Sequence, residues 1–166
     1  MTVKLEIKDG IAVVTIDNPP VNALGKAVRE RLLALTLELD TDPAVTAVVL
    51  TGAGKLFVGG ADITEFDRPV EGPTLPEVIN GIEGAAKPWI AAIRGAALGG
   101  GLELPLGCRL RVVASDARLA LPEVSLGLIP GAGGTQRLPR LIGVETAIGM
   151  IAGGTVVDAR SAAACG

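Results

Sequence analysis

The sequence contains no histidine and no tyrosine. The absence of histidine excludes a Ser-His-Asp triad, a Cys-His dyad and any metal site with an imidazole ligand. It also removes the side chain that most often transfers protons near neutral pH. If this chain performs proton chemistry, carboxylates are the first candidates and lysine is a weaker one.

The chain also lacks the patterns typical of membrane, secreted and nucleic-acid-binding proteins. Its longest apolar runs, such as Trp89–Ile93, are far too short to span a bilayer, and its N-terminus has no apolar signal-peptide core. No run of Lys or Arg occurs, and the net charge is -3 with a pI near 5.0. Cys108 and Cys165 have no metal-ligand spacing. We therefore expect reduced thiols, a cytoplasmic location, and no metal, membrane or nucleic-acid partner.

Strand-like and helix-like patterns alternate along the chain. With 166 residues, of which 49% are hydrophobic and 20% charged, residues 1–166 suffice for one domain with a real core. Asp9-Gly10 between two alternating runs predicts a hairpin, and strands that then alternate with helices predict an α/β fold with a largely parallel sheet. The ending "DARSAAACG" resembles an unfinished helix, so we expect the chain to stop inside its own fold. Strands are expected at 3–8, 11–17, 44–52, 89–95, 110–115 and 118–121, and helices at 25–40, near 63–67, at 75–86, at 99–108 and from 135 onward.

Three stretches are rich in glycine: "GAGKLFVGGAD" (52–62), "LGGGLE" (98–103) and "GLIPGAGGTQ" (127–136). None matches a phosphate-binding or dinucleotide-binding pattern. Glycine also leaves backbone N–H groups uncovered, and such donors suit a carbonyl oxygen that gains negative charge. We expect Gly99–Gly101 to open a helix with such donors and Gly60-Ala61 to supply another. Taken alone, any one of these stretches is more typical of a structural turn than of a binding site.

Two glutamates stand beside these stretches. Glu103 follows the three glycines between Leu102 and Leu104, and Glu123 follows Pro122. Each alone is typical of the first turn of a helix. Burial among apolar neighbours would raise their pKa values toward the range useful for proton transfer. Together, and beside uncovered amides, the two carboxylates form a coherent set of groups for acid–base chemistry.

Longer motifs carry a family resemblance. "VGGADI", "GAALGGGLELPLGC" and "LPEVSLGLIPGAGGTQRLPRLIG" are together similar to the enoyl-CoA hydratase/isomerase (crotonase) family, over about residue 3 to the end. "NPPVNAL" (18–24) is particularly similar to the hydratase/isomerase half of multifunctional β-oxidation enzymes. The resemblance implies a crotonase-like spiral of ββα units, with the C-terminal part of that fold absent from this chain.

The resemblance also implies roles for individual residues. Glu103 and Glu123 correspond to the acid/base pair, and the amides of Ala61 and Gly100 correspond to the oxyanion hole. Gly131 corresponds to a glycine that helps to position the reacting water. Contacts with coenzyme A are expected from Lys55, Gly60, Ala61, Asp62 and Ile63.

The implied reaction is the addition of water across the 2,3 double bond of a 2-enoyl-CoA thioester. It needs no cofactor, because coenzyme A is part of the substrate. Two alternatives stay open: a Δ3-Δ2-enoyl-CoA isomerase that uses Glu123 as its proton shuttle, and an inactive acyl-CoA-binding or assembly module. If the full-length fold is present, a homo-oligomer is expected, a trimer or a dimer of trimers. Pro105 departs from the family pattern, and a proline at this position removes an N–H group and can kink the helix that carries Glu103.

Overall fold

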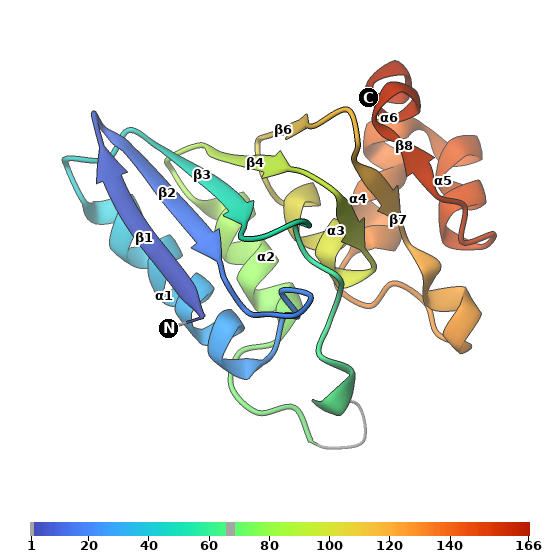
Figure 1. Cartoon of the computed structure of the whole chain (residues 1–166), viewed down its shortest axis with the longest axis horizontal. Helices are drawn as coiled ribbons and strands as arrows, with labels where there is room; N and C mark the ends of the chain where they lie inside the picture. Colours follow the sequence, from blue (N-terminus) through green and yellow to red (C-terminus); the bar gives the residue numbers. More distant parts are fainter. Residues whose placement is uncertain (1, 66–68) are drawn as a thin grey trace.

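The computed structural model describes residues 2–65 and 69–166, which form two sheets with helices packed against them (Figure 1). The larger sheet has the strand order β1-β2-β3-β4-β6, and the smaller has the order β5-β7-β8. The α/β class predicted from the sequence is confirmed. The strands are β1 (Val3–Lys8), β2 (Ile11–Ile16), β3 (Ala47–Gly52), β4 (Trp89–Ile93), β5 (Ala96–Leu98), β6 (Leu110–Val113), β7 (Arg118–Ala120) and β8 (Val157–Asp158).

The larger sheet begins with the predicted hairpin. β1 and β2 pair antiparallel around Asp9 and Gly10, whose φ angles of 50° and 81° are the left-handed values that a tight two-residue hairpin turn requires. The next pairs, β2 with β3, β3 with β4 and β4 with β6, are all parallel. Parallel strands need crossover connections, and the helices between them supply these connections.

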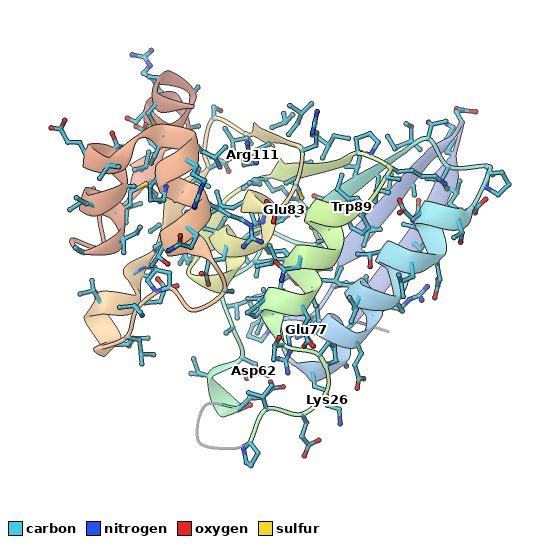
Figure 2. The ribbon with its side chains drawn as sticks, turned by 180° about the vertical axis from the view of Figure 1, so that it is seen from behind. Lys26, Asp62, Glu77, Glu83, Trp89 and Arg111 are labelled. Carbon is cyan, nitrogen blue, oxygen red and sulfur yellow. The ribbon has the colours of Figure 1, made fainter. Side chains whose placement is uncertain are left out.

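Two helices cover one face of the larger sheet. α1 and α2 run side by side across it, and Figure 2 shows both in front of the strands, with Trp89 of β4 on the sheet behind them. The buried side of α1 includes Val28, Leu32, Leu35 and Leu39, the stripe that the apolar spacing predicts. No helix within 2–65 and 69–166 is long and apolar enough to cross a membrane. The helices are α1 (Lys26–Thr41), α2 (Leu75–Gly84), α3 (Gly100–Leu106), α4 (Gly134–Ile142), α5 (Val144–Ile151) and α6 (Ala159–Cys165), with short 3-10 turns η1 (Ile63–Glu65) and η2 (Pro122–Leu126).

A buried asparagine ties the start of the chain to the segment that follows β3. Asn22 is 4% exposed and has a φ of 54°, and its side-chain amide bonds three carbonyl groups. These are the carbonyl oxygens of Ala53, Leu56 and Phe57, at 2.9, 3.2 and 3.1 Å. Because buried carbonyl groups need donors, this one side chain fixes the path of the segment that leads into Val58 and the glycines after it.

The smaller sheet was only partly predicted. β7 was expected, whereas β5 and β8 are strands of three and two residues with too few side chains to show a period. The helix predicted for 99–108 is shorter, at Gly100–Leu106, and the piece near 63–67 is η1, with its last two positions outside the described residues. The "DARSAAACG" segment contains the end of β8 and then α6.

Candidate active site

Two backbone amides meet where β5 runs into α3. Val58 forms a parallel bridge with Ala97, and the amide of Leu98 donates to the carbonyl oxygen of Val58 at 3.1 Å. The two segments run parallel, and three residues further along them Ala61 lies beside Gly100. A β-carbon added to Gly100 would lie 3.4 Å from the nitrogen of Ala61. The predicted oxyanion-hole pair is therefore adjacent in space.

Neither of these amides has an acceptor among the residues that the structure describes. Gly100 is the first residue of α3, where the N–H group has no partner within the helix. The position of Ala61 is set from the other side, because the amide of Leu24 donates to the carbonyl oxygen of Gly60 at 2.9 Å. Two uncovered donors held by secondary structure form a fixed site for a developing oxyanion.

Glu103 lies on α3 and is 3% exposed. Its Oε1 accepts hydrogen bonds from the amides of Ala132 and Gly134, both at 2.8 Å. Pro105 does not disturb this arrangement. The amide of Glu103 itself donates to the carbonyl oxygen of Gly99 at 2.9 Å, and the helical bond that Pro105 cannot donate is the one to the carbonyl oxygen of Gly101. Two amides hold the carboxylate of Glu103.

Glu123 is in η2, immediately after Pro122 at the start of that turn. Its Oε2 is buried and has no hydrogen-bond partner within the described part of the chain. A β-carbon added to Gly99 would lie 3.2 Å from Glu123 Oε1, and Gly99 has a φ of 54°. Glycine at this position therefore allows the carboxyl group to approach the backbone next to the Gly100 amide.

Both carboxyl groups hold their protons more strongly than an exposed glutamate does. Burial raises the pKa of Glu103, while hydrogen bonds from Gly134 and Ala132 and the charge of Arg137 act against the rise. Burial also raises the pKa of Glu123, a hydrogen bond from its own backbone amide acts against this rise, and the nearby charge of Glu103 adds to it. Hydrogen-bond donors thus favour the ionised form of Glu103, whereas the unpaired oxygen of Glu123 favours its neutral form.

The raised pKa of Glu123 makes a prediction about stability. A carboxyl group with a raised pKa in the folded state contributes stability that is fully present below its ordinary pKa of 4.5 and is lost as the pH rises through the folded-state value. Glu123→Gln cannot lose a proton, so we expect this variant to be more stable than the parent chain at pH 8 and to lose that advantage near pH 4. Urea unfolding at both pH values measures the difference.

The control for this prediction is Glu145→Gln, because Glu145 is exposed in the first turn of α5. We expect its effect on stability to be small and alike at the two pH values. A Glu123→Gln variant that is less stable than the parent at pH 8 would contradict the argument that an ionised Glu123 is a burden to the fold.

All four groups line one pocket of about 390 Å³. Gly60, Ile63 and Gly131 also line it, whereas Lys55 and Asp62 do not. The oxygen Oδ1 of Asp62 instead accepts from the amide and hydroxyl of Thr64, a local turn. Most of the remaining wall is apolar and consists of Leu75, Pro76, Leu98, Pro122, Leu126, Leu128, Ile129 and Ala132.

The groups that hold Glu103 were not predicted from the sequence. The amides of Ala132 and Gly134 lie in the glycine-rich stretch 127–136, in which Gly131 alone had a predicted role. The signal that could have found them is the pair of small residues flanking Gly133, whose φ of 100° turns both neighbouring amides to one side.

Two other hollows occur in the described part of the chain. One, of about 370 Å³, is apolar and lies among α3, α4 and α6, and the other, of about 540 Å³, lies beside Lys87 and Arg109. Neither combines uncovered amides with two carboxyl groups. Within 2–65 and 69–166, no group of three or more His, Cys, Asp or Glu residues is placed to hold a metal ion.

The geometry suits a substrate with a carbonyl group and an apolar tail. Two amides can stabilise negative charge on the carbonyl oxygen, while two carboxyl groups nearby can exchange protons with adjacent carbon atoms. The apolar walls favour a hydrocarbon chain.

Comparisons with known proteins give relatives of this chain. The chain is 51% identical over 156 residues to a peroxisomal bifunctional enzyme of Danio rerio, covering 94% of this chain and 22% of that protein. It is 42% identical over 167 residues to a Bacillus subtilis protein named "Probable enoyl-CoA hydratase", covering 96% of this chain and 65% of that protein. The chain thus spans about a fifth of the first relative and just under two thirds of the second.

Solved structures share the fold. A crystal structure of an enoyl-CoA hydratase from Bacillus anthracis superimposes with a TM-score of 0.92 at 35% identity, covering 100% of this chain and 68% of that one. The family description "Enoyl-CoA hydratase/isomerase" matches residues 6–166. The chain therefore belongs to the enoyl-CoA hydratase/isomerase family, and its fold is the crotonase fold over the N-terminal part that these residues cover.

Proposed function

We propose that this chain carries the site of an enoyl-CoA hydratase, which adds water across the 2,3 double bond of a 2-enoyl-CoA thioester. The observation that carries the proposal is the meeting of two unpartnered amides, Ala61 and Gly100, with the buried Glu103 and the half-buried Glu123 in one apolar pocket. The thioester oxygen would accept hydrogen bonds from both amides. The acyl chain would extend along the apolar wall.

Each glutamate has a distinct part in the proposed reaction. In this proposal Glu103 acts in its ionised form, which the two amides that donate to its Oε1 favour, and it takes a proton from the water whose oxygen adds to the β-carbon. Glu123 acts in its neutral form, which the burial of its unpartnered Oε2 favours, and it gives its proton to the α-carbon. Between these transfers, negative charge spreads onto the thioester oxygen, where the two amides stabilise it. Losing one such donor would raise the barrier by about 3 kcal/mol.

The test is the loss of absorbance of the conjugated enoyl thioester when a short 2-enoyl-CoA is added to the chain. Disappearance of the band with appearance of the 3-hydroxyacyl-CoA supports the proposal. If a saturated acyl-CoA binds in calorimetry but no hydration occurs, the chain is an acyl-CoA-binding module and the proposal fails. Light scattering on the same sample tests the expected homo-oligomer.

Isomerisation of a 3-enoyl-CoA to the 2-enoyl-CoA is a second candidate, favoured by the free oxygen of Glu123. One carboxyl group suffices to move a proton between two carbon atoms, whereas hydration needs a second group on the water. We therefore expect Glu103→Gln to reduce hydration by roughly 10²–10⁴-fold and to reduce isomerisation much less. Parallel assays with 2-enoyl-CoA and 3-enoyl-CoA measure the two rates. Equal losses in both reactions would contradict this division of roles.

A further inference from the structure

One positively charged side chain, that of Arg137, lies beside the turn that holds Glu103. Arg137 is on α4, and its side chain is 16% exposed. Its guanidinium group donates to the carboxylate of Glu83 at 2.6 Å and to the side-chain oxygen of Asn80 at 2.8 Å, both on α2. Figure 2 shows Glu83 near the end of α2, where that helix passes α4. Arg137 therefore links the two helices that lie on either side of Glu103.

The same guanidinium group contacts the turn that holds Glu103. One of its nitrogens, Nη1, donates to the carbonyl oxygen of Ala132 at 3.2 Å. A β-carbon added to Gly133 would lie 2.1 Å from Nη1, so the planar group is pressed against this glycine. The residues on each side of Gly133 are Ala132 and Gly134, whose amides bind Glu103 Oε1. The cation thus contacts the turn on the side opposite the carboxylate.

The charged groups around Glu103 are few. Arg137 faces it across the turn from α4, and Glu123 faces it from η2. Glu83, on α2, is paired with Arg137 and is 54% exposed at its side chain. Removing the charge of Arg137 would leave Glu103 with its two amides and the repulsion of Glu123.

We propose that Arg137 is a positioning residue that holds the Ala132–Gly134 turn so that both amides point at Glu103 Oε1. The role of Glu103 as the base in hydration rests on the proposed function, whereas the positioning of the turn does not. A fork of donors suits this task, because the guanidinium group bonds a carbonyl of the turn and two acceptors on α2 at once.

The first test is nuclear magnetic resonance of the 166-residue chain, which needs no activity. We expect the amide protons of Ala132 and Gly134 to shift with pH as Glu103 ionises. In Arg137→Met we expect both amide signals to lie further upfield than in the parent, because the turn no longer holds the two amides against Glu103. The midpoint of their pH-dependent shift should move to higher pH. Arg137→Lys keeps the charge but loses the fork, so its midpoint should stay closer to that of the parent while the downfield position is lost.

Arg140→Met is the matched control, because Arg140 is one turn further along α4, is exposed, and donates to Gln136 alone among the described residues. If Arg137→Met gives the same signals and midpoint as Arg140→Met, the proposal is overturned. If Arg137→Met does not fold, Glu83→Gln decides. Glu83→Gln removes the charge of the exposed partner of Arg137, and we expect it to move the amide signals of Ala132 and Gly134 in the direction expected for Arg137→Met. Unchanged signals would refute the role of the contact between Arg137 and Glu83.

The second test is kinetic. In Arg137→Met we expect kcat for hydration to fall by up to about 10²-fold with KM little changed, because a displaced base misses the reacting water. The acid side of the pH–rate profile should also move to higher pH. If the parent chain hydrates no enoyl-CoA, the proposed function fails, and the resonance result alone then decides whether Arg137 holds the turn. If the parent is active and the kcat and profile of Arg137→Met equal those of Arg140→Met, the proposal fails.

Discussion

Glu123→Gln is expected to lower the rate of hydration by about 10³-fold, and isomerisation equally, within the range typical of a lost general acid. An amide occupies the same space but has no proton that it can give to the α-carbon. The oxyanion hole and the walls of the pocket remain, so binding of a saturated acyl-CoA should be retained. Initial rates with both substrates, together with calorimetry of the saturated ligand, measure the two effects.

The loss of activity must be separated from a loss of folding. Because the same substitution is expected to stabilise the chain at pH 8, a slower and more stable variant would exclude unfolding as the cause. Glu145→Gln on the exposed face of α5 is the control and should retain the parent rate. Hydration by Glu123→Gln within about tenfold of the parent would remove Glu123 from the role of proton donor.

Gly101→Ala is expected to destabilise the chain by about 3 kcal/mol, the upper end of the usual effect of overpacking. A β-carbon on Gly101 would lie 2.2 Å from the carbonyl oxygen of Val58 and 2.8 Å from its carbon. Both atoms belong to backbone, so α3 must move away from the strand-like segment at Val58. That movement also separates Gly100 from Ala61, and activity should fall with stability. Urea unfolding and the hydration assay report the two losses.

Gly149→Ala supplies the matched control for this helix substitution. Gly149 is exposed on α5, and a β-carbon there meets nothing within 4 Å. Alanine is a better helix former than glycine, so this variant should be more stable than the parent by roughly 0.5–1 kcal/mol. Opposite signs for the two substitutions are the expected result. If Gly101→Ala also stabilises the chain, the close approach of α3 to Val58 is not a feature of the folded protein.

Much of the larger sheet could be predicted because its elements are long and regular. Asp9-Gly10 between alternating strands and the Val28, Leu32, Leu35, Leu39 stripe are local signals that tertiary packing did not override. β5 and β8 could not be found, because short strands have no measurable period and are defined by their partners. Val58 and Ala97, which pair across 39 positions of sequence, illustrate the limit.

The residues of the candidate site could be predicted from the sequence, but the groups that hold them in place could not. Ala61, Gly100, Glu103 and Glu123 were identified through motifs, and the structure brings all four to one pocket. The contrast between the two carboxyl groups was not predictable, because it depends on which oxygen atoms find donors after folding. The effect of Pro105 on Glu103 was not predictable either, because sequence alone does not show that amides of a distant turn hold the carboxylate of Glu103.

The three hydrogen bonds of Asn22 have a consequence for the order in which the chain folds. They join residues 31 to 35 positions apart, and the acceptors are in place only when β2 and β3 have paired. Closing a loop of this size is costly until other contacts share the entropy loss, so the stretch that carries Ala61 should order after the central strands. Solvent exchange at the hydrogen-bonded amides of this stretch, such as those of Phe57 and Val58, should then require opening of the sheet itself, and local fraying should contribute little. The position of the Ala61 amide therefore depends on an asparagine that is distant along the chain.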